Sequence, residues 1–313
     1  MNKIALRHAI AEALFSIAQV DPRVVVVTSD ARGSAGISMF FDQMPERAVE
    51  VGIAEQSAVG IAAGLALSGK KAFVFGPACF YSARSFEQIK NDIAYTGSNV
   101  KIIGVSGGVS YGPLGSTHHT LHDIALFRAT PGIDVILPSD AFQATAIIKM
   151  LCERENPAYL RVGRNPVPLI YDSSESTFDY GKGVVLRKGQ DVVLIAIGEV
   201  VWHALEAARF LAEEGIDATV LDMPFIKPLD EELIIEVASQ IQRVVTIEEH
   251  SVYGGLGEAV VHCLSELPSV AVKILGIPDE YPVTGTQEEV YRHYGFHAEG
   301  IKGAVMDFLG KVG

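Results

Sequence analysis

Short apolar runs recur along the first half of the chain and alternate with longer amphipathic stretches. Residues 24–28 (Val-Val-Val-Val-Thr) are continuously apolar and β-branched, which is typical of a strand buried on both faces. The same pattern predicts strands at residues 72–75, 100–105, 135–137 and 158–160. Helices are predicted at residues 3–18, 56–67, 84–95, 121–128 and 141–153. This alternation predicts a mainly parallel sheet covered by helices.

A segment rich in proline and polar residues interrupts the alternation between residues 165 and 177, which is typical of a linker. Beyond it the pattern resumes, with strands predicted at residues 192–197, 218–221, 244–247 and 272–275. Helices are predicted at residues 199–214, 231–240, 257–264 and 300–309. We therefore expect an α/β protein of two domains, each a mostly parallel sheet flanked by helices. The expected division is residues 1–170, a linker at 171–185, and residues 186–313.

Composition and charge narrow the class of protein. The 313 residues are 49% hydrophobic, enough for two domains with cores of their own. A net charge of -13 argues against nucleic acid and anionic membranes as main partners. Three widely spaced cysteines favour a reducing compartment. The charged N-terminus argues against a signal peptide. No apolar window is long enough for a membrane span. These features predict a soluble cytoplasmic protein.

One acidic residue stands at the start of an apolar stretch. Glu55 precedes residues 57–69, which are all small or apolar and predict a buried, tightly packed helix. Burying an unpaired carboxylate is costly, so Glu55 is expected to be protonated or to have a partner. A protonated carboxyl can donate a hydrogen bond to a heterocycle. The alternative is a glutamate that only complements the helix dipole.

Loops after the predicted strands are the other candidates, because ligands of parallel sheets bind beyond the carboxyl ends of the strands. Residues 28–34 form a small polar loop, suited either to a substrate or to a solvated turn. Phe80 and Tyr81 stand near Arg84, so they could stack on a ring and hold an anion, or they could fill the core.

Residues 107–119 form a long glycine-rich loop, and such loops are usually functional. His118 and His122 have a spacing that a metal site could use, but proton transfer or contact with a substrate hydroxyl is favoured. Arg161 and Arg164 follow a predicted strand and suit either an anionic group or a salt bridge to the linker.

Taken together, these segments resemble the transketolases. Residues 51–67, 80–93, 115–119 and 123–132 are similar to the pyrimidine-binding domain, and residues 196–226 and 246–258 to the transketolase C-terminal domain. The resemblance is closest to the carboxyl-terminal subunit of split, two-chain transketolases. That family binds thiamine diphosphate and Mg²⁺ through Gly-Asp-Gly and a later Asn, and this chain has no Gly-Asp-Gly. The resemblance therefore implies a separate amino-terminal subunit that holds the diphosphate and Mg²⁺, in a heterotetramer.

The resemblance also implies roles for individual residues. Glu55 would bond the aminopyrimidine of the cofactor and promote formation of its nucleophilic carbon. Phe80 or Tyr81 would stack on the pyrimidine, His118 would contact the sugar, and Asp30 would lie near the cofactor. The positions that match ligands of the acceptor phosphate are Arg7, Ser34 and Arg164.

Three departures from the family pattern concern substrate recognition. Leu114 stands where many transketolases have an acidic residue, Ser106 replaces a histidine, and His119 replaces a common glutamine. These changes point to a modified sugar with an anionic terminus, and they leave the donor and acceptor open. The predicted function is transfer of a two-carbon ketol unit from a ketose to an aldose. The alternatives are the β subunit of a 2-oxoacid dehydrogenase and a non-catalytic scaffold.

Overall fold

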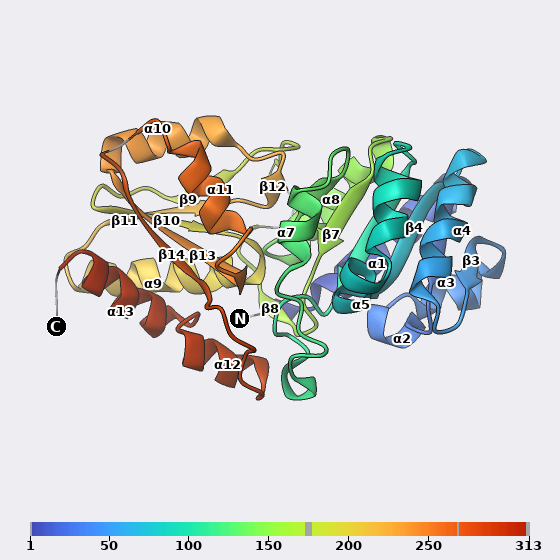
Figure 1. Cartoon of the computed structure of the whole chain (residues 1–313), viewed down its shortest axis with the longest axis horizontal. Helices are drawn as coiled ribbons and strands as arrows, with labels where there is room; N and C mark the ends of the chain where they lie inside the picture. Colours follow the sequence, from blue (N-terminus) through green and yellow to red (C-terminus); the bar gives the residue numbers. More distant parts are fainter. Residues whose placement is uncertain (1, 173–176, 268, 311–313) are drawn as a thin grey trace.

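The computed structural model describes residues 2–172, 177–267 and 269–310, which form two α/β lobes (Figure 1). The first lobe contains a seven-stranded sheet of order β12-β6-β7-β5-β4-β2-β3. Its strands are β2 (Val24–Thr28), β3 (Ala48–Glu50), β4 (Lys71–Pro77), β5 (Val100–Val105), β6 (Asp134–Ile136), β7 (Ala158–Arg161) and β12 (Phe225–Lys227). Neighbouring strands are parallel, except that β12 pairs antiparallel with β6.

The two faces of this sheet pack against different helices, as β2 shows. Val24 and Val26 point into one apolar cluster, and Val25 and Val27 point into another, because successive side chains of a strand alternate between faces. On one side lie α1 (Leu6–Val20), α3 (Ser38–Gln43) and α8 (Ala141–Glu153). On the other lie α4 (Glu55–Leu67), the π-helix η2 (Ile89–Ala94) and α7 (Asp123–Arg128). A strand covered on both faces explains the continuous apolar run at residues 24–28.

The second lobe is built around a five-stranded sheet of order β14-β13-β10-β11-β9. Its strands are β9 (Val184–Arg187), β10 (Val192–Ala196), β11 (Ala218–Asp222), β13 (Arg243–Ser251) and β14 (Ala271–Ile277), of which only β9 is antiparallel to its neighbour. Helices α10 (Glu231–Ile241) and α11 (Leu256–Cys263) cover one face, and α9 (Val201–Glu213) and α13 (Ala298–Phe308) cover the other (Figure 1). Helix α12 (Gln287–Tyr294) lies near the first lobe.

The predicted α/β architecture of two mostly parallel sheets is confirmed, and one predicted helix is wrong at its start. Residues 84–95 were expected to be a single helix, but the chain is already helical in α5 (Ala78–Arg84). Proline at position 77 stands at the boundary and marks that start. After Ser85 the chain continues as α6 (Phe86–Gln88) and then as η2. Phe80 and Tyr81 are therefore helical residues and not part of a loop.

The segment between the lobes overlaps the second sheet. Residues 173–176 of the predicted linker lie outside the described residues, and β9 begins two residues before the predicted linker ends. The boundaries at residues 170 and 186 remain a prediction. Within the described ranges, the helices are all too short or too polar to cross a bilayer.

Candidate functional site

Five of the predicted site residues follow strands of the first sheet at one edge of it. Asp30 follows β2, Glu55 follows β3, Phe80 follows β4, His118 follows β5, and Arg164 follows β7. Because these strands are parallel, their carboxyl ends meet at the same edge. The fold therefore gathers residues that are far apart in the sequence into one region.

Glu55 is the first residue of α4, and only 3% of its surface is exposed. Its carboxylate lies 2.7 Å from the Arg84 guanidinium, from Oε2 to Nη1. The same guanidinium stands over the Phe80 ring, 4.7 Å from the ring centroid. A buried acid was expected either to be protonated or to have a partner, and the structure gives Glu55 a partner in Arg84. The anion that Arg84 holds here is a side chain of the protein.

Only one face of α4 is buried, contrary to the expectation of a tightly packed helix. Ala58 and Ala62 face the core, whereas Ile61 is 41% exposed and Leu67 is 74% exposed. A methyl group added at Gly60 would meet no atom within 4 Å. One apolar face of α4 is therefore not covered by any described residue of the chain. This face begins one turn from Glu55. Large apolar faces of this kind usually mark an interface.

A row of ring contacts continues from Phe80 across the site. The rings of Phe80 and His118 are 5.4 Å apart, and those of His118 and Tyr111 are 5.3 Å apart, both edge to face. The Arg164 guanidinium lies 5.4 Å from the centroid of Tyr111. His118 is also 3.0 Å from the Thr117 hydroxyl, through Nδ1. The row joins the buried carboxylate at one end to a guanidinium at the other.

The two candidate stacking rings differ in exposure. Tyr81 is completely buried, and its hydroxyl is 3.0 Å from the Ser29 hydroxyl. Its ring packs so closely on β4 that a Cβ at Gly76 would lie 2.3 Å from Cε2. Phe80 is only partly buried. In this conformation, Phe80 is the member of the pair with surface open to a ligand.

Arg7 and Arg164 form a pair of cations without a carboxylate partner among the described residues. Arg7 donates from Nη1 to the backbone carbonyl of Ser34 at 2.9 Å, and its buried Nε has no hydrogen-bond partner within the described ranges. Burial, followed by the nearby charge of Arg164, lowers the pKa of Arg7 below its ordinary value. Two neighbouring guanidinium groups without a counter-ion suit a bound anion.

Asp30 is exposed and has a left-handed backbone, with φ of 54°. Its N–H donates to Oε1 of Glu50 at 2.7 Å, and Gly52 donates to the same oxygen at 3.0 Å. The sequence argument missed Glu50, which also accepts from Arg32 at 3.0 Å. Glu50 ends a strand two residues before a glycine, and it fixes the loops that flank the site.

Arg161 is not available to a substrate, and among the described residues its partners lie outside the linker. It is buried between the lobes, 3.3 Å from Oδ1 of Asp123 and 3.6 Å from Oε2 of Glu249. His119 is also buried, and its Nε2 lies 3.0 Å from the carbonyl of Gly112. Burial lowers the pKa of His119, which favours its neutral form.

The site fits one end of the expected cofactor. A buried carboxylate and a partly open phenyl ring suit an aromatic heterocycle, whereas the sequence lacks the Gly-Asp-Gly needed for Mg²⁺ and diphosphate.

Fold and site are those of a pyrimidine-binding domain followed by a C-terminal domain, the class found in thiamine-diphosphate enzymes. The family model of the transketolase pyrimidine-binding domain matches residues 2–168, and that of the transketolase C-terminal domain matches residues 181–301. The chain belongs to the transketolase family.

Relatives and solved structures agree with this assignment. The chain is 51% identical over 310 residues to a subunit of the apulose-4-phosphate transketolase of Phocaeicola vulgatus, covering 99% of each chain. It is 37% identical over 296 residues to a 6-deoxy-6-sulfo-D-fructose transketolase subunit of a Clostridium species, covering 95% of this chain and 92% of that one. A solved split-gene transketolase, described as an inactive β4 tetramer, matches with a TM-score of 0.90 and 40% identity, covering 98% of this chain and 99% of that one. The chain is a transketolase-type transferase subunit, and the 2-oxoacid dehydrogenase alternative is not favoured.

Proposed function

We propose that this chain is the carboxyl-terminal subunit of a split transketolase that moves a two-carbon ketol unit from an anionic ketose to an aldose. The observation that carries the proposal is the row of contacts from Glu55 to Arg164. One end of the row offers a carboxylate to a heterocycle, and the other offers guanidinium groups to an anion. A cofactor and a sugar phosphate could therefore lie side by side along the row.

Thiamine diphosphate, when bound, supplies the nucleophilic carbon that accepts the ketol unit. In the proposed site, Glu55 presents its carboxyl group to the pyrimidine edge, and Arg84 fixes the orientation of that group. Of Phe80 and Tyr81, Phe80 provides the stacking surface because it is the partly open ring, and Asp30 lies near the cofactor. Mg²⁺ and the diphosphate are assigned to the partner subunit, which we expect to contain Gly-Asp-Gly.

His118, with Arg7, Ser34 and Arg164, is proposed to bind the sugar. His118 contacts a sugar hydroxyl, and the two arginines hold the anionic terminus, with Ser34 fixing Arg7 through its carbonyl. The relative that is 51% identical is named for apulose 4-phosphate, so that sugar phosphate is the first donor to test. A sulfonated sugar is the second, because another relative acts on a sulfofructose.

The uncovered face of α4 is proposed to bind the diphosphate-holding subunit. The face begins one turn from Glu55, so a subunit that completes the cofactor site must approach this end of the helix. A heterotetramer of two chains of each kind is the proposed assembly. The free cysteines Cys79, Cys152 and Cys263 fit a reducing compartment, and the cytoplasm is proposed on that ground.

The test is reconstitution of the two subunits with thiamine diphosphate and Mg²⁺, followed by a screen of ketose donors and aldose acceptors. We expect ketol transfer that requires both subunits. Glu55→Ala should lower kcat/KM by roughly 10²–10⁴-fold, the range usual for loss of an acid–base group. Near-normal turnover by Glu55→Ala would instead support the non-catalytic alternative, and transfer of an acyl group to a lipoyl acceptor would support the dehydrogenase.

A further inference from the structure

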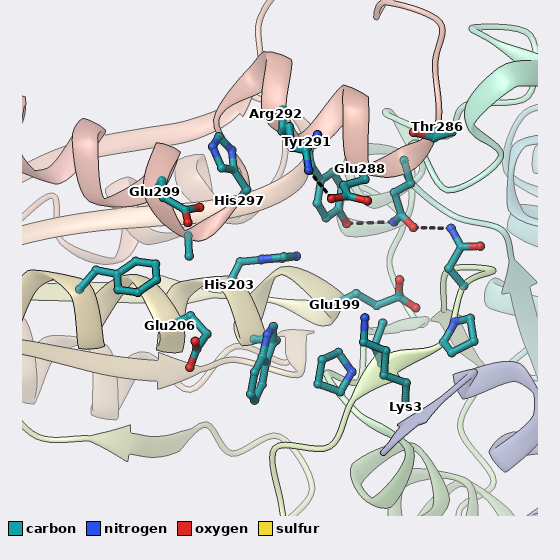
Figure 2. Close-up of a pocket in the computed structure, with 18 residues that line it drawn as sticks. Lys3, Glu199, His203, Glu206, Thr286, Glu288, Tyr291, Arg292, His297 and Glu299 are labelled. Atoms are coloured by element: carbon teal, nitrogen blue, oxygen red, sulfur yellow. Dashed lines mark hydrogen bonds and ion pairs between the residues drawn. The ribbon is translucent and has the colours of Figure 1, made fainter. Parts of the chain in front are cut away.

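Two carboxylates of the second lobe bond the backbone of the first lobe beside the site. Oε1 of Glu249, near the end of β13, accepts the N–H of Val109 at 2.9 Å. Oε1 of Glu199, in the turn that precedes α9, accepts the N–H of Gly163 at 2.9 Å. Both carboxylates are buried. Glu199 also lines a cavity of about 720 Å³ between the lobes, where Figure 2 shows it apart from the other labelled acids.

A glycine makes each approach possible. A Cβ at Gly108 would lie 2.2 Å from Cδ of Glu249, and a Cβ at Gly163 would lie 2.2 Å from Oε2 of Glu199. No side chain larger than hydrogen fits at either position without displacing the carboxylate. The two contacts are therefore built in the same way, from opposite sides of the lobe junction.

The bonded amides stand next to residues of the proposed site. Val109 begins the part of the glycine-rich loop that carries Tyr111 and His118, and Gly163 directly precedes Arg164. The far end of that loop also rests on the second lobe, since the Ser116 hydroxyl donates to a backbone carbonyl there at 3.4 Å. Both segments are thus held by the second lobe in addition to their own contacts in the first lobe, where the Gly107 N–H donates to the Val162 carbonyl at 2.9 Å.

Glu249 is itself fixed by Arg161. The guanidinium donates to the backbone carbonyl of Glu249 at 2.7 Å and lies 3.6 Å from its carboxylate. The other side of Arg161 contacts Asp123, which is completely buried. Burying so many charges costs free energy even when they are paired. Well-packed apolar residues at the junction would stabilise the fold to a similar extent. A positioning role explains why acids occupy these places.

We propose that Glu199 and Glu249 are positioning residues of the active site, through which the second lobe sets the geometry of substrate binding. Glu249 holds the loop that carries Tyr111 and His118, and Glu199 holds the segment that carries Arg164. The inference rests on the proposed function, because it takes His118 and Arg164 to contact the sugar.

The ionisation of the two acids guides the choice of variants. Burial, followed by the nearby charge of Glu249, raises the pKa of Glu199 to about 8, so this carboxyl is mainly protonated at neutral pH. Glutamine is then a close substitute for Glu199 and keeps an oxygen for the Gly163 amide. Glu249 faces Arg161, so neither alanine nor glutamine replaces it fully. Glu206→Ala is the matched control, because Glu206 lines the same cavity and, in the part of the chain that the structure describes, its side chain bonds Arg209 of its own helix and not the first lobe.

The first experiment is hydrogen–deuterium exchange on the isolated full chain, without cofactor or partner. Glu199→Ala should speed exchange in peptides covering residues 162–166, and Glu249→Ala should do so across residues 107–119. Glu199→Gln and Glu206→Ala should leave both segments as in the wild type. Unchanged exchange in these segments, or faster exchange spread evenly over the chain, would overturn the inference.

The second experiment is steady-state kinetics of the reconstituted enzyme. Glu199→Ala should raise KM for the anionic substrate roughly 10- to 100-fold with little change in kcat, as expected when a binding group is misplaced by about 1 Å. Glu199→Gln should restore the wild-type KM. If exchange changes as expected but KM for the anionic substrate does not, the positioning role is refuted while the proposed function stands. If no subunit pair transfers ketol units, the proposed function fails, and the exchange experiment still decides whether the acids hold the two segments.

Discussion

The guanidinium of Arg84 lies 2.7 Å from the carboxylate of Glu55 and is its only side-chain partner among the residues that the structure describes. Glu55 is buried, whereas the Arg84 side chain is 48% exposed. The pair therefore bridges the interior of the lobe and its surface. An acid held in this way can remain in an apolar setting and still present its second oxygen to a ligand.

Removing Arg84 tests how far Glu55 depends on it. Arg84→Met should lower the free energy of unfolding by about 1–3 kcal/mol, because a buried acceptor loses its donor. Half-exposure of the arginine favours the lower end of that range. The double variant Glu55→Gln with Arg84→Met should recover most of the loss, which urea unfolding of the four proteins would measure. If the losses of stability in the two single variants simply add in the double variant, the contact does not stabilise the fold.

The two arginines without carboxylate partners predict a charge-specific effect on substrate binding. Arg7→Ala and Arg164→Ala should each raise KM for the anionic substrate roughly 10- to 100-fold and change kcat little. Lysine should restore the activity only in part, since it cannot form two parallel hydrogen bonds to an anion.

The control for the arginine variants is Arg209→Ala, an exposed change on α9 that should have no effect. The decisive comparison is between a charged aldose acceptor and an uncharged aldose with the same number of carbon atoms. The KM for the uncharged aldose should be nearly the same in the wild type and in both arginine variants. An equal loss on charged and uncharged acceptors would assign the arginines to the fold and not to the anion.

Sequence patterns were sufficient wherever the structure depends on local burial. Strand β2 and helix α8 lie within the predicted bounds, because an apolar run identifies one and Asp140 caps the other by accepting from Gln143 at 2.9 Å. A further helix was missed although its signal was present. Thr286 and Glu289 form a capping box at the start of α12, in the spacing that marks such a start.

What could not be predicted are contacts across the lobe junction. Arg161 was expected to bind an anion or the linker because its partners, Asp123 and Glu249, lie 38 and 88 residues away in the sequence. Strand β12 joins the sheet of the other lobe through β6, and its three-residue sequence, Phe-Ile-Lys, gives no sign of that pairing. The open face of α4 was expected to be buried, because composition alone cannot separate a core from an interface.

That open face predicts where the diphosphate-holding subunit binds. Ile61→Asp should abolish formation of the complex, since a charge would be buried in the interface. The variant chain should stay folded, with a melting temperature within a few degrees of the wild type, because Ile61 is already 41% exposed. Light scattering after size exclusion would report the assembly. Val20→Asp, at an exposed position on α1, should assemble normally. Normal assembly of Ile61→Asp would place the interface elsewhere.

The buried carboxyl of Glu199 predicts a dependence of stability on pH. Its pKa is about 8 in the folded chain against 4.5 in the unfolded one, so between these values the folded protein holds a proton that the unfolded chain has lost. The contribution of Glu199 to stability is therefore fully present below about pH 4.5 and is lost as the pH rises through about 8. Glutamine cannot ionise, so the stability of Glu199→Gln relative to the wild type should increase from pH 5 to pH 8 and then level off.

The increase should reach at most about 1.4 kcal/mol per pH unit, the limit for one proton. Urea unfolding at four pH values would measure it, and buried histidines such as His203 and His250 cancel because both proteins contain them. A flat difference for Glu199→Gln would mean that Glu199 is ionised in the folded chain. In that case Glu199 would bond the Gly163 amide as a carboxylate, and glutamine would no longer be a neutral replacement for it.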